Sequence, residues 1–83
     1  MLGLSKYVKI VGIEDAAGWV KIKYLARVGK EGYNIPSETI YPKTALTKEV
    51  NQLSPGDIVE VERAADGSSI SQIITMGGKK VFS

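Results

Sequence analysis

The chain contains neither cysteine nor histidine. The first absence excludes disulfides and thiolate nucleophiles, and the second excludes imidazole metal ligands and Ser-His or Cys-His nucleophile pairs. The carboxylates form no informative cluster, since Glu14-Asp15 fits a solvated turn and Glu60 and Glu62 fit outward positions on a strand. The glycines form no Walker or dinucleotide-binding motif. We therefore expect a protein that is not an enzyme and that uses no cofactor and no metal.

Long apolar runs are absent as well. No segment approaches the length of a membrane span, and the start, residues 1–4, is too short for the apolar region of a signal peptide. We therefore expect a soluble, cytoplasmic protein without membrane association. The 83 residues suffice for one small domain, 1–83, with a thin core. A net charge of +2 excludes a histone-like polycation, although cations cluster at 21–30 and acids at 60–62.

Residues 19–28 alternate between apolar and polar side chains, which predicts a β-strand with two different faces. The expected core face carries Val20, Ile22, Tyr24, Ala26 and Val28. The other face carries Trp19, Lys21, Lys23, Leu25 and Arg27. Cations beside a large aromatic suit a single nucleic-acid strand, because cations contact phosphates and the ring stacks on a base. The alternative is an ordinary solvated face with a tryptophan at the sheet edge.

Four further strands are expected at 6–13, 33–41, 57–63 and 68–76, separated by turns at 14–18, 29–32 and 64–67. Pro36 cannot donate a backbone hydrogen bond, so 33–41 is expected either at an edge or broken at Pro36. Leu46, Val50 and Leu53 recur at helical spacing and predict one short helix, with Thr44 or Thr47 as N-cap and Pro55-Gly56 as its end. We expect a core domain over 5–76 and a flexible basic tail at 77–83.

The order strand, strand, strand, helix, strand, strand, with the helix-to-strand joint at 53–61, resembles the OB-fold. This resemblance implies an all-β architecture, a five-stranded Greek-key barrel with a helix between the third and fourth strands. It also implies a ligand face on the second and third strands, walled by 14–18 and 64–67. The expected nucleic-acid contacts are Trp19, Lys21, Lys23, Arg27, Lys30, Tyr33 and Tyr41. For Tyr33 and Tyr41, packing at the edge of the barrel is the alternative.

Gly29-Lys30-Glu31-Gly32 also resembles the G-x-x-G loop of KH domains. That loop joins two helices, whereas Pro36 and the period-two pattern of 19–28 favour a hairpin turn. We therefore expect non-enzymatic binding of single-stranded nucleic acid, with DNA favoured and little sequence preference. The alternative is an SH3-like small barrel that binds a peptide or a partner subunit. The proline-marked edge strand also leads us to expect a homodimer.

Overall fold

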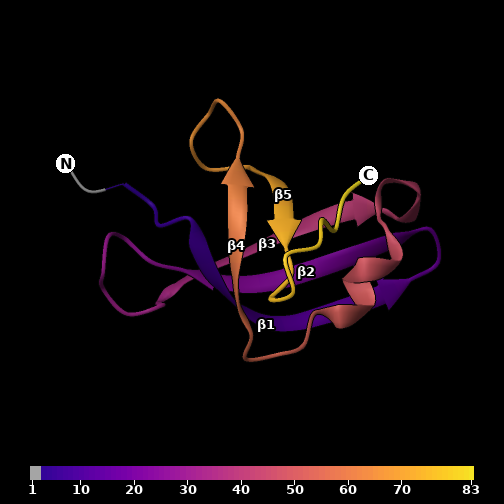
Figure 1. Cartoon of the computed structure of the whole chain (residues 1–83), viewed down its shortest axis with the longest axis horizontal. Coiled ribbons are helices and arrows are strands. Elements are labelled where there is room, and N and C mark those ends of the chain that lie inside the picture. The colour runs from indigo at the N-terminus through magenta and orange to yellow at the C-terminus, as the bar shows by residue number, and fades with distance from the viewer. Residues whose placement is uncertain (1–2) are drawn as a thin grey trace.

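The computed structural model describes residues 3–83. It contains five antiparallel strands, β1 (Tyr7–Ala16), β2 (Trp19–Ala26), β3 (Ile35–Pro42), β4 (Ile58–Arg63) and β5 (Ile70–Ile74). Their order in the sheet is β3-β2-β1-β4-β5 (Figure 1). Two hairpins join β1, β2 and β3, and β4 returns after a long connection to lie beside β1. The first four strands therefore form a Greek key, and the prediction of a mostly β fold with five strands is confirmed.

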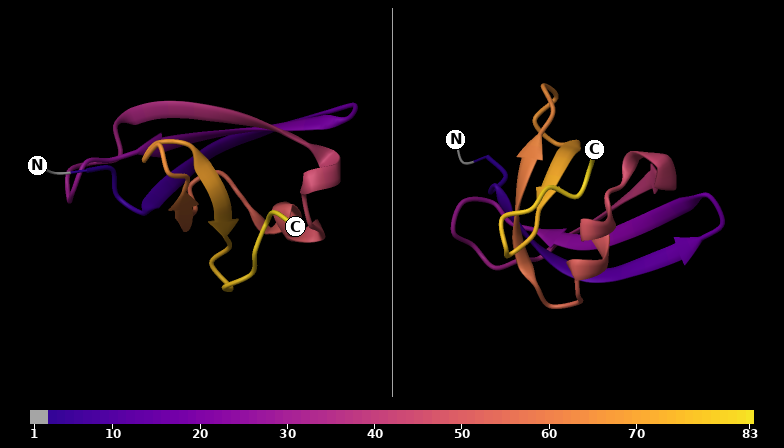
Figure 2. Two further views of the ribbon diagram at one scale, coloured as in Figure 1. Left: turned by 90° about the horizontal axis from the view of Figure 1, so that it is seen from above. Right: turned by 45° about the vertical axis from the view of Figure 1, so that its right-hand side comes forward.

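The central strand β1 belongs to two layers. Its first residues pair with β4, from Tyr7 opposite Glu60, and the remainder pairs with β2. The register shifts between Ile10 and Gly12, which makes Val11 the extra residue of a β-bulge and bends the strand. In Figure 2 the long β1–β3 ribbons form one layer, with β4, β5 and the C-terminal segment on one side of it. Among residues 3–83, β3 and β5 do not pair, so backbone hydrogen bonds do not close the sheet into the expected barrel.

The core lies between these two layers. The predicted inward face of β2 is confirmed at Val20, Ile22, Tyr24 and Ala26, which are all buried, whereas Val28 is half-buried beyond the strand. These side chains pack against apolar residues from β1, β4 and β5. Leu53, before β4, and Val81, after β5, also belong to this cluster. The buried hydrophobic cluster comprises Val8, Ile10, Val20, Ile22, Tyr24, Ala26, Leu53, Val59, Val61, Ile70, Ile73 and Val81.

The predicted helix between the third and fourth strands is wrong. The segment instead forms two short 3₁₀ turns, η1 (Lys43–Ala45) and η2 (Lys48–Gln52). They are separated because Leu46 is extended and pairs with Phe82, which interrupts the helical path. Thr47 does act as an N-cap, since its side chain accepts a hydrogen bond from the backbone N–H of Glu49. No helix within residues 3–83 has the length and apolarity to cross a bilayer.

The C-terminal segment is not the flexible tail that the sequence suggested. After a turn at 75–79, the chain runs back along β5, where the Val81 N–H donates to the carbonyl of Ile73. The side chain of Val81 is fully buried. On its other side the Val81 carbonyl accepts a 2.7 Å bond from the N–H of Thr47. Residues 79–83 therefore join β5 to the 3₁₀ turns, and we call them the C-terminal strap.

Candidate nucleic-acid interface

The outward face of the β1–β3 layer carries Trp19, Lys21 and Lys23, as predicted from their alternation with the core residues. Trp19 is 37% exposed, so a large aromatic residue is partly open to solvent on this face. The Lys21 ammonium lies 6.0 Å from the centre of the Trp19 ring. An exposed ring and the Lys21 cation thus lie together at one end of β2, and Lys23 lies further along the strand.

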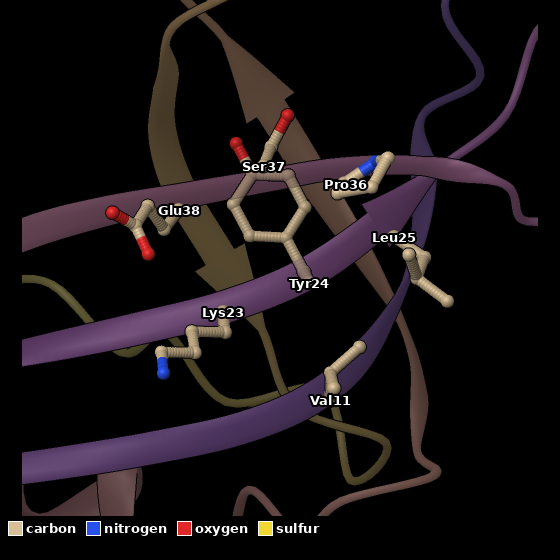
Figure 3. A pocket seen from close by; sticks show the side chains of 7 residues that line it. All are labelled: Val11, Lys23, Tyr24, Leu25, Pro36, Ser37 and Glu38. Atoms are coloured by element: carbon tan, nitrogen blue, oxygen red, sulfur yellow. The ribbon is translucent and has the colours of Figure 1, made fainter.

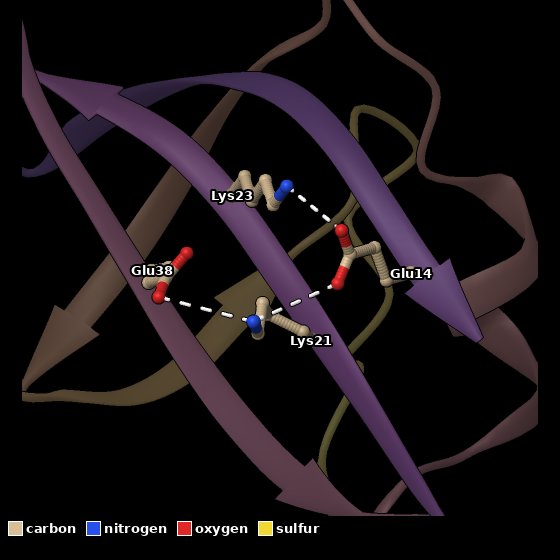
Figure 4. A network of polar contacts seen from close by, with 4 residues as sticks. All are labelled: Glu14, Lys21, Lys23 and Glu38. Carbon is tan, nitrogen blue, oxygen red and sulfur yellow. Dashed lines mark ion pairs between the residues drawn. The ribbon is translucent and has the colours of Figure 1, made fainter. Parts of the chain in front are cut away.

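Two carboxylates share this face with the lysines (Figure 4). Glu14, on β1, lies 2.8 Å from the Lys23 ammonium and 3.6 Å from that of Lys21. Glu38, on β3, lies 3.9 Å from Lys21. The hydrogen bond and charge of Lys23 lower the pKa of Glu14, and Glu14 in turn raises the pKa of Lys23. Both members of this pair are therefore charged at neutral pH, and the face is less basic than its lysines alone suggested.

A second cation and aromatic pair lies beyond the other end of β2. The Arg27 guanidinium stacks over the Tyr33 ring, 4.5 Å from its centre. Lys30 is exposed in the loop between these two residues. Trp19 and Arg27 are separated by roughly 25 Å along an extended strand. A ligand that contacts both ends must therefore be several residues long.

Tyr41 does not share this face. It lies directly opposite Val20 in the β2–β3 register, and opposed residues of an antiparallel pair point to the same side of the sheet. Its ring packs against Phe82 with centroids 4.2 Å apart. Burial raises the pKa of the Tyr41 phenol. Tyr41 thus packs from β3 against the C-terminal strap. This matches the alternative of packing at the edge of the sheet.

An apolar hollow lies between the two ends of the face. It measures about 330 Å³ and is lined by residues from β1, β2 and β3 (Figure 3). Its apolar lining residues are Val11, Tyr24, Leu25 and Pro36, and Lys23, Ser37 and Glu38 also line it. The bulge places Val11 outward, where it is 49% exposed. An apolar surface between cations can take the flat face of a base or the side chain of a peptide.

The second predicted wall, 64–67, is the turn between β4 and β5. Asp66 organises it by accepting hydrogen bonds from the backbone N–H groups of Ser68 and Ser69 and from the Ser69 hydroxyl. These bonds lower the pKa of Asp66. The carboxylate is thus committed to shaping the turn.

No group of three or more acidic, histidine or cysteine side chains in residues 3–83 is arranged to hold a metal. No protein-family model, curated protein or solved structure matches the chain. The only support for the candidate interface is therefore the geometry of its own residues.

Sequence reasoning missed the residues that complete this interface. Glu14 was assigned to a turn, but β1 continues to Ala16 and only Ala17-Gly18 turn, which places Glu14 opposite Lys21. A two-residue hairpin turn would have predicted this pairing, because it fixes the register. No pattern in the amino-acid sequence predicts the outward position of Val11. It results from the β-bulge, which depends on how β1 bends between its two neighbours, β2 and β4.

Proposed function

We propose that this protein binds single-stranded nucleic acid, DNA in preference, with little sequence preference and without catalysis. The binding surface would be the outer face of β2 and β3. One observation carries the proposal: the outer face of β2 combines the exposed Trp19 ring with the Lys21 ammonium beside it and Lys23 further along the strand, and a stacked Arg27–Tyr33 pair lies beyond the end of β2. Aromatic rings stack on any base, and cations follow the phosphates, so this combination binds without reading sequence.

The topology supports an OB-fold assignment for this chain. β1 pairs with both β2 and β4 in a Greek key, and the loops of 17–18 and 64–69 lie between β1 and β2 and between β4 and β5. In OB-folds the face of the second and third strands, with the loops of these two connections, contacts oligonucleotides. The proposed face of this chain is the corresponding surface. The 3₁₀ turns and the C-terminal strap would take the place of the helix that covers the barrel end.

The ion pairs on the face do not oppose the proposal. Their carboxylates are exposed, and exposed ion pairs contribute little to stability because water screens them. A phosphate can therefore replace a carboxylate as the partner of Lys21 or Lys23 at low cost. Backbone phosphates also arrive as a connected series, which several cations bind together.

The test is a titration of a fluorescently labelled single-stranded oligonucleotide at two salt concentrations. Phosphate contacts by Lys21, Lys23, Arg27 and Lys30 would weaken binding by roughly 50-fold between about 50 and 200 mM salt. A duplex of the same sequence serves as the control and should bind more weakly, because its bases are not free to stack. Absence of binding at low salt would refute the proposal.

One observation favours a second candidate function, the binding of an extended peptide or a partner subunit. The hollow between Val11, Leu25 and Pro36 is mainly apolar, and Glu14 and Glu38 balance the neighbouring lysines. A peptide held by apolar contact would depend only weakly on salt, so the same titration separates the two functions.

A homodimer also stays a proposal. β3 is one of the two edge strands of the described sheet, and its Pro36 and Pro42 lack the N–H groups needed to pair along its whole length. A second copy would therefore pair only with the segment between the prolines. Sedimentation at micromolar concentration should give the mass of two chains, and a single-chain mass would contradict the proposal.

A further inference from the structure

The Glu14 carboxylate is held by two ammonium groups at once. One of its oxygens lies 2.8 Å from the Lys23 Nζ and the other lies 3.6 Å from the Lys21 Nζ. The three side chains meet on the outer face, with Glu14 coming from β1 and both lysines from β2 (Figure 4). A single anionic group thus bridges the two lysines that the proposed function assigns to phosphate binding.

We propose that the Glu14 carboxylate occupies a phosphate site, and that a phosphodiester group of the bound strand displaces it. This inference rests on the proposed function. A carboxylate and a phosphodiester each carry one negative charge and offer two oxygens that accept hydrogen bonds from ammonium groups. The same pair of lysines can therefore hold either anion, and Glu14 competes with the ligand and lowers its affinity.

The surroundings of Glu14 permit this exchange. Its side chain is 50% exposed and that of Lys23 is 42% exposed, so the carboxylate can swing into solvent without opening the core. Lys21 is more enclosed, with 23% exposure, and lies between Glu14 and Glu38. Lys21 thus keeps a partner on the face, Glu38, when Glu14 leaves. Glu38, at 3.9 Å from Lys21 alone, is the weaker competitor.

The experiment compares three charge-neutralising variants in the oligonucleotide titration. Glu14→Gln should bind about fivefold more tightly than the wild type, and Glu38→Gln about twofold more tightly. Glu62→Gln, on β4 and exposed, removes the same charge away from the site and should leave affinity nearly unchanged. The advantage of Glu14→Gln should shrink as salt rises, because ions screen the competing carboxylate.

A second measurement uses the unaltered protein. Carbon-13 NMR of the Glu14 side-chain carboxyl should show a clear shift when unlabelled oligonucleotide is added, because the carboxylate loses its ammonium partners. The Glu62 carboxyl, distant from the site, should not shift.

The outcomes distinguish the inference from the function on which it rests. If the wild type binds and Trp19→Ala weakens binding, but Glu14→Gln behaves like Glu62→Gln or binds more weakly than the wild type, the inference fails and the proposed function stands. The inference also fails, and the proposed function stands, if the NMR signal of the Glu14 carboxyl does not change when the oligonucleotide binds. If the wild type binds no oligonucleotide at low salt, both fail.

Discussion

At the scale of single residues, Trp19 and Ile22 show how adjacent parts of one strand serve different purposes. Trp19 is 37% exposed on the outer face, whereas Ile22 is fully buried. Trp19→Ala should weaken oligonucleotide binding by about 1–3 kcal/mol through lost base stacking and leave the domain folded. Ile22→Ala should instead lower the free energy of unfolding by about 2–5 kcal/mol, because it leaves a cavity.

Binding isotherms and chemical denaturation of both variants test this pair. Ile58→Ala is the control, since Ile58 is exposed on β4, away from the outer face of β2 and β3. This variant should leave both the affinity for the oligonucleotide and the free energy of unfolding nearly unchanged. Unfolding caused by Trp19→Ala would contradict the assignment of the two faces.

The ion pair of Glu14 predicts a pH dependence of stability. Lys23 lowers the pKa of Glu14 below its ordinary value of 4.5. A carboxyl group with a lowered pKa in the folded state stabilises the protein above its unfolded pKa, and this contribution is lost as pH falls through the folded pKa. Glu14→Gln should therefore melt at a lower temperature than the wild type at pH 7, and the difference should vanish in strong acid.

Thermal unfolding monitored by circular dichroism at both pH values measures this difference. In a Lys23→Gln background the pH dependence should be smaller, because the main partner of Glu14 is missing. A melting difference that persists in strong acid would show that Glu14 stabilises the fold by another route.

Residue patterns in the sequence predicted the two faces of β2 because alternation reports directly on side-chain direction in a strand. The same patterns gave no information on Tyr41. Its side of the sheet depends on the register between β2 and β3, where Val20 faces Tyr41. A shift of one residue in that register would have turned Tyr41 outward.

At the scale of elements, the C-terminal strap is an integral part of the fold. Val81 is fully buried, and the Gln72 side chain holds Phe82 with hydrogen bonds to its N–H, at 2.8 Å, and to its carbonyl, at 3.0 Å. Val81→Ala should therefore lower the free energy of unfolding by about 2 kcal/mol. Urea denaturation measures the change.

Lys80→Ala is the control for the strap, because Lys80 is exposed and its contacts to Ile74 and Thr47 use the backbone. This variant should keep the stability of the wild type. A Val81→Ala variant as stable as the wild type would mean that the strap is dispensable.

The strap also explains why the helix prediction failed. Leu46, Val50 and Leu53 do turn toward the core, so their spacing reported burial correctly. Spacing alone cannot report that Leu46 pairs with Phe82 and that Thr47 bonds to the backbone of Val81. These long-range bonds hold Leu46 and Thr47 in extended conformations, which an α-helix excludes.

At the scale of the whole molecule, the number of strands and their order along the chain could be predicted from the amino-acid sequence. Whether the sheet closes into a barrel could not. Each strand is rich in β-forming residues and each turn has its glycine or proline, which are local signals. Whether β3 and β5 meet depends on the twist and bend of the entire sheet. In residues 3–83 Tyr41 and Phe82 pack across this gap without strand pairing.

The pairing of β1 with β4 has a consequence for how the chain folds. The two hairpins among β1, β2 and β3 join neighbours in the sequence, but Tyr7 meets Glu60 only after the intervening chain has closed a long loop. Loop closure costs conformational entropy before any contact compensates for it, so distant pairings form late. We expect Val59→Ala, which removes a buried side chain opposite Val8 in the β1–β4 pairing, mainly to accelerate unfolding, and Ile22→Ala mainly to slow refolding, in stopped-flow measurements of Trp19 fluorescence.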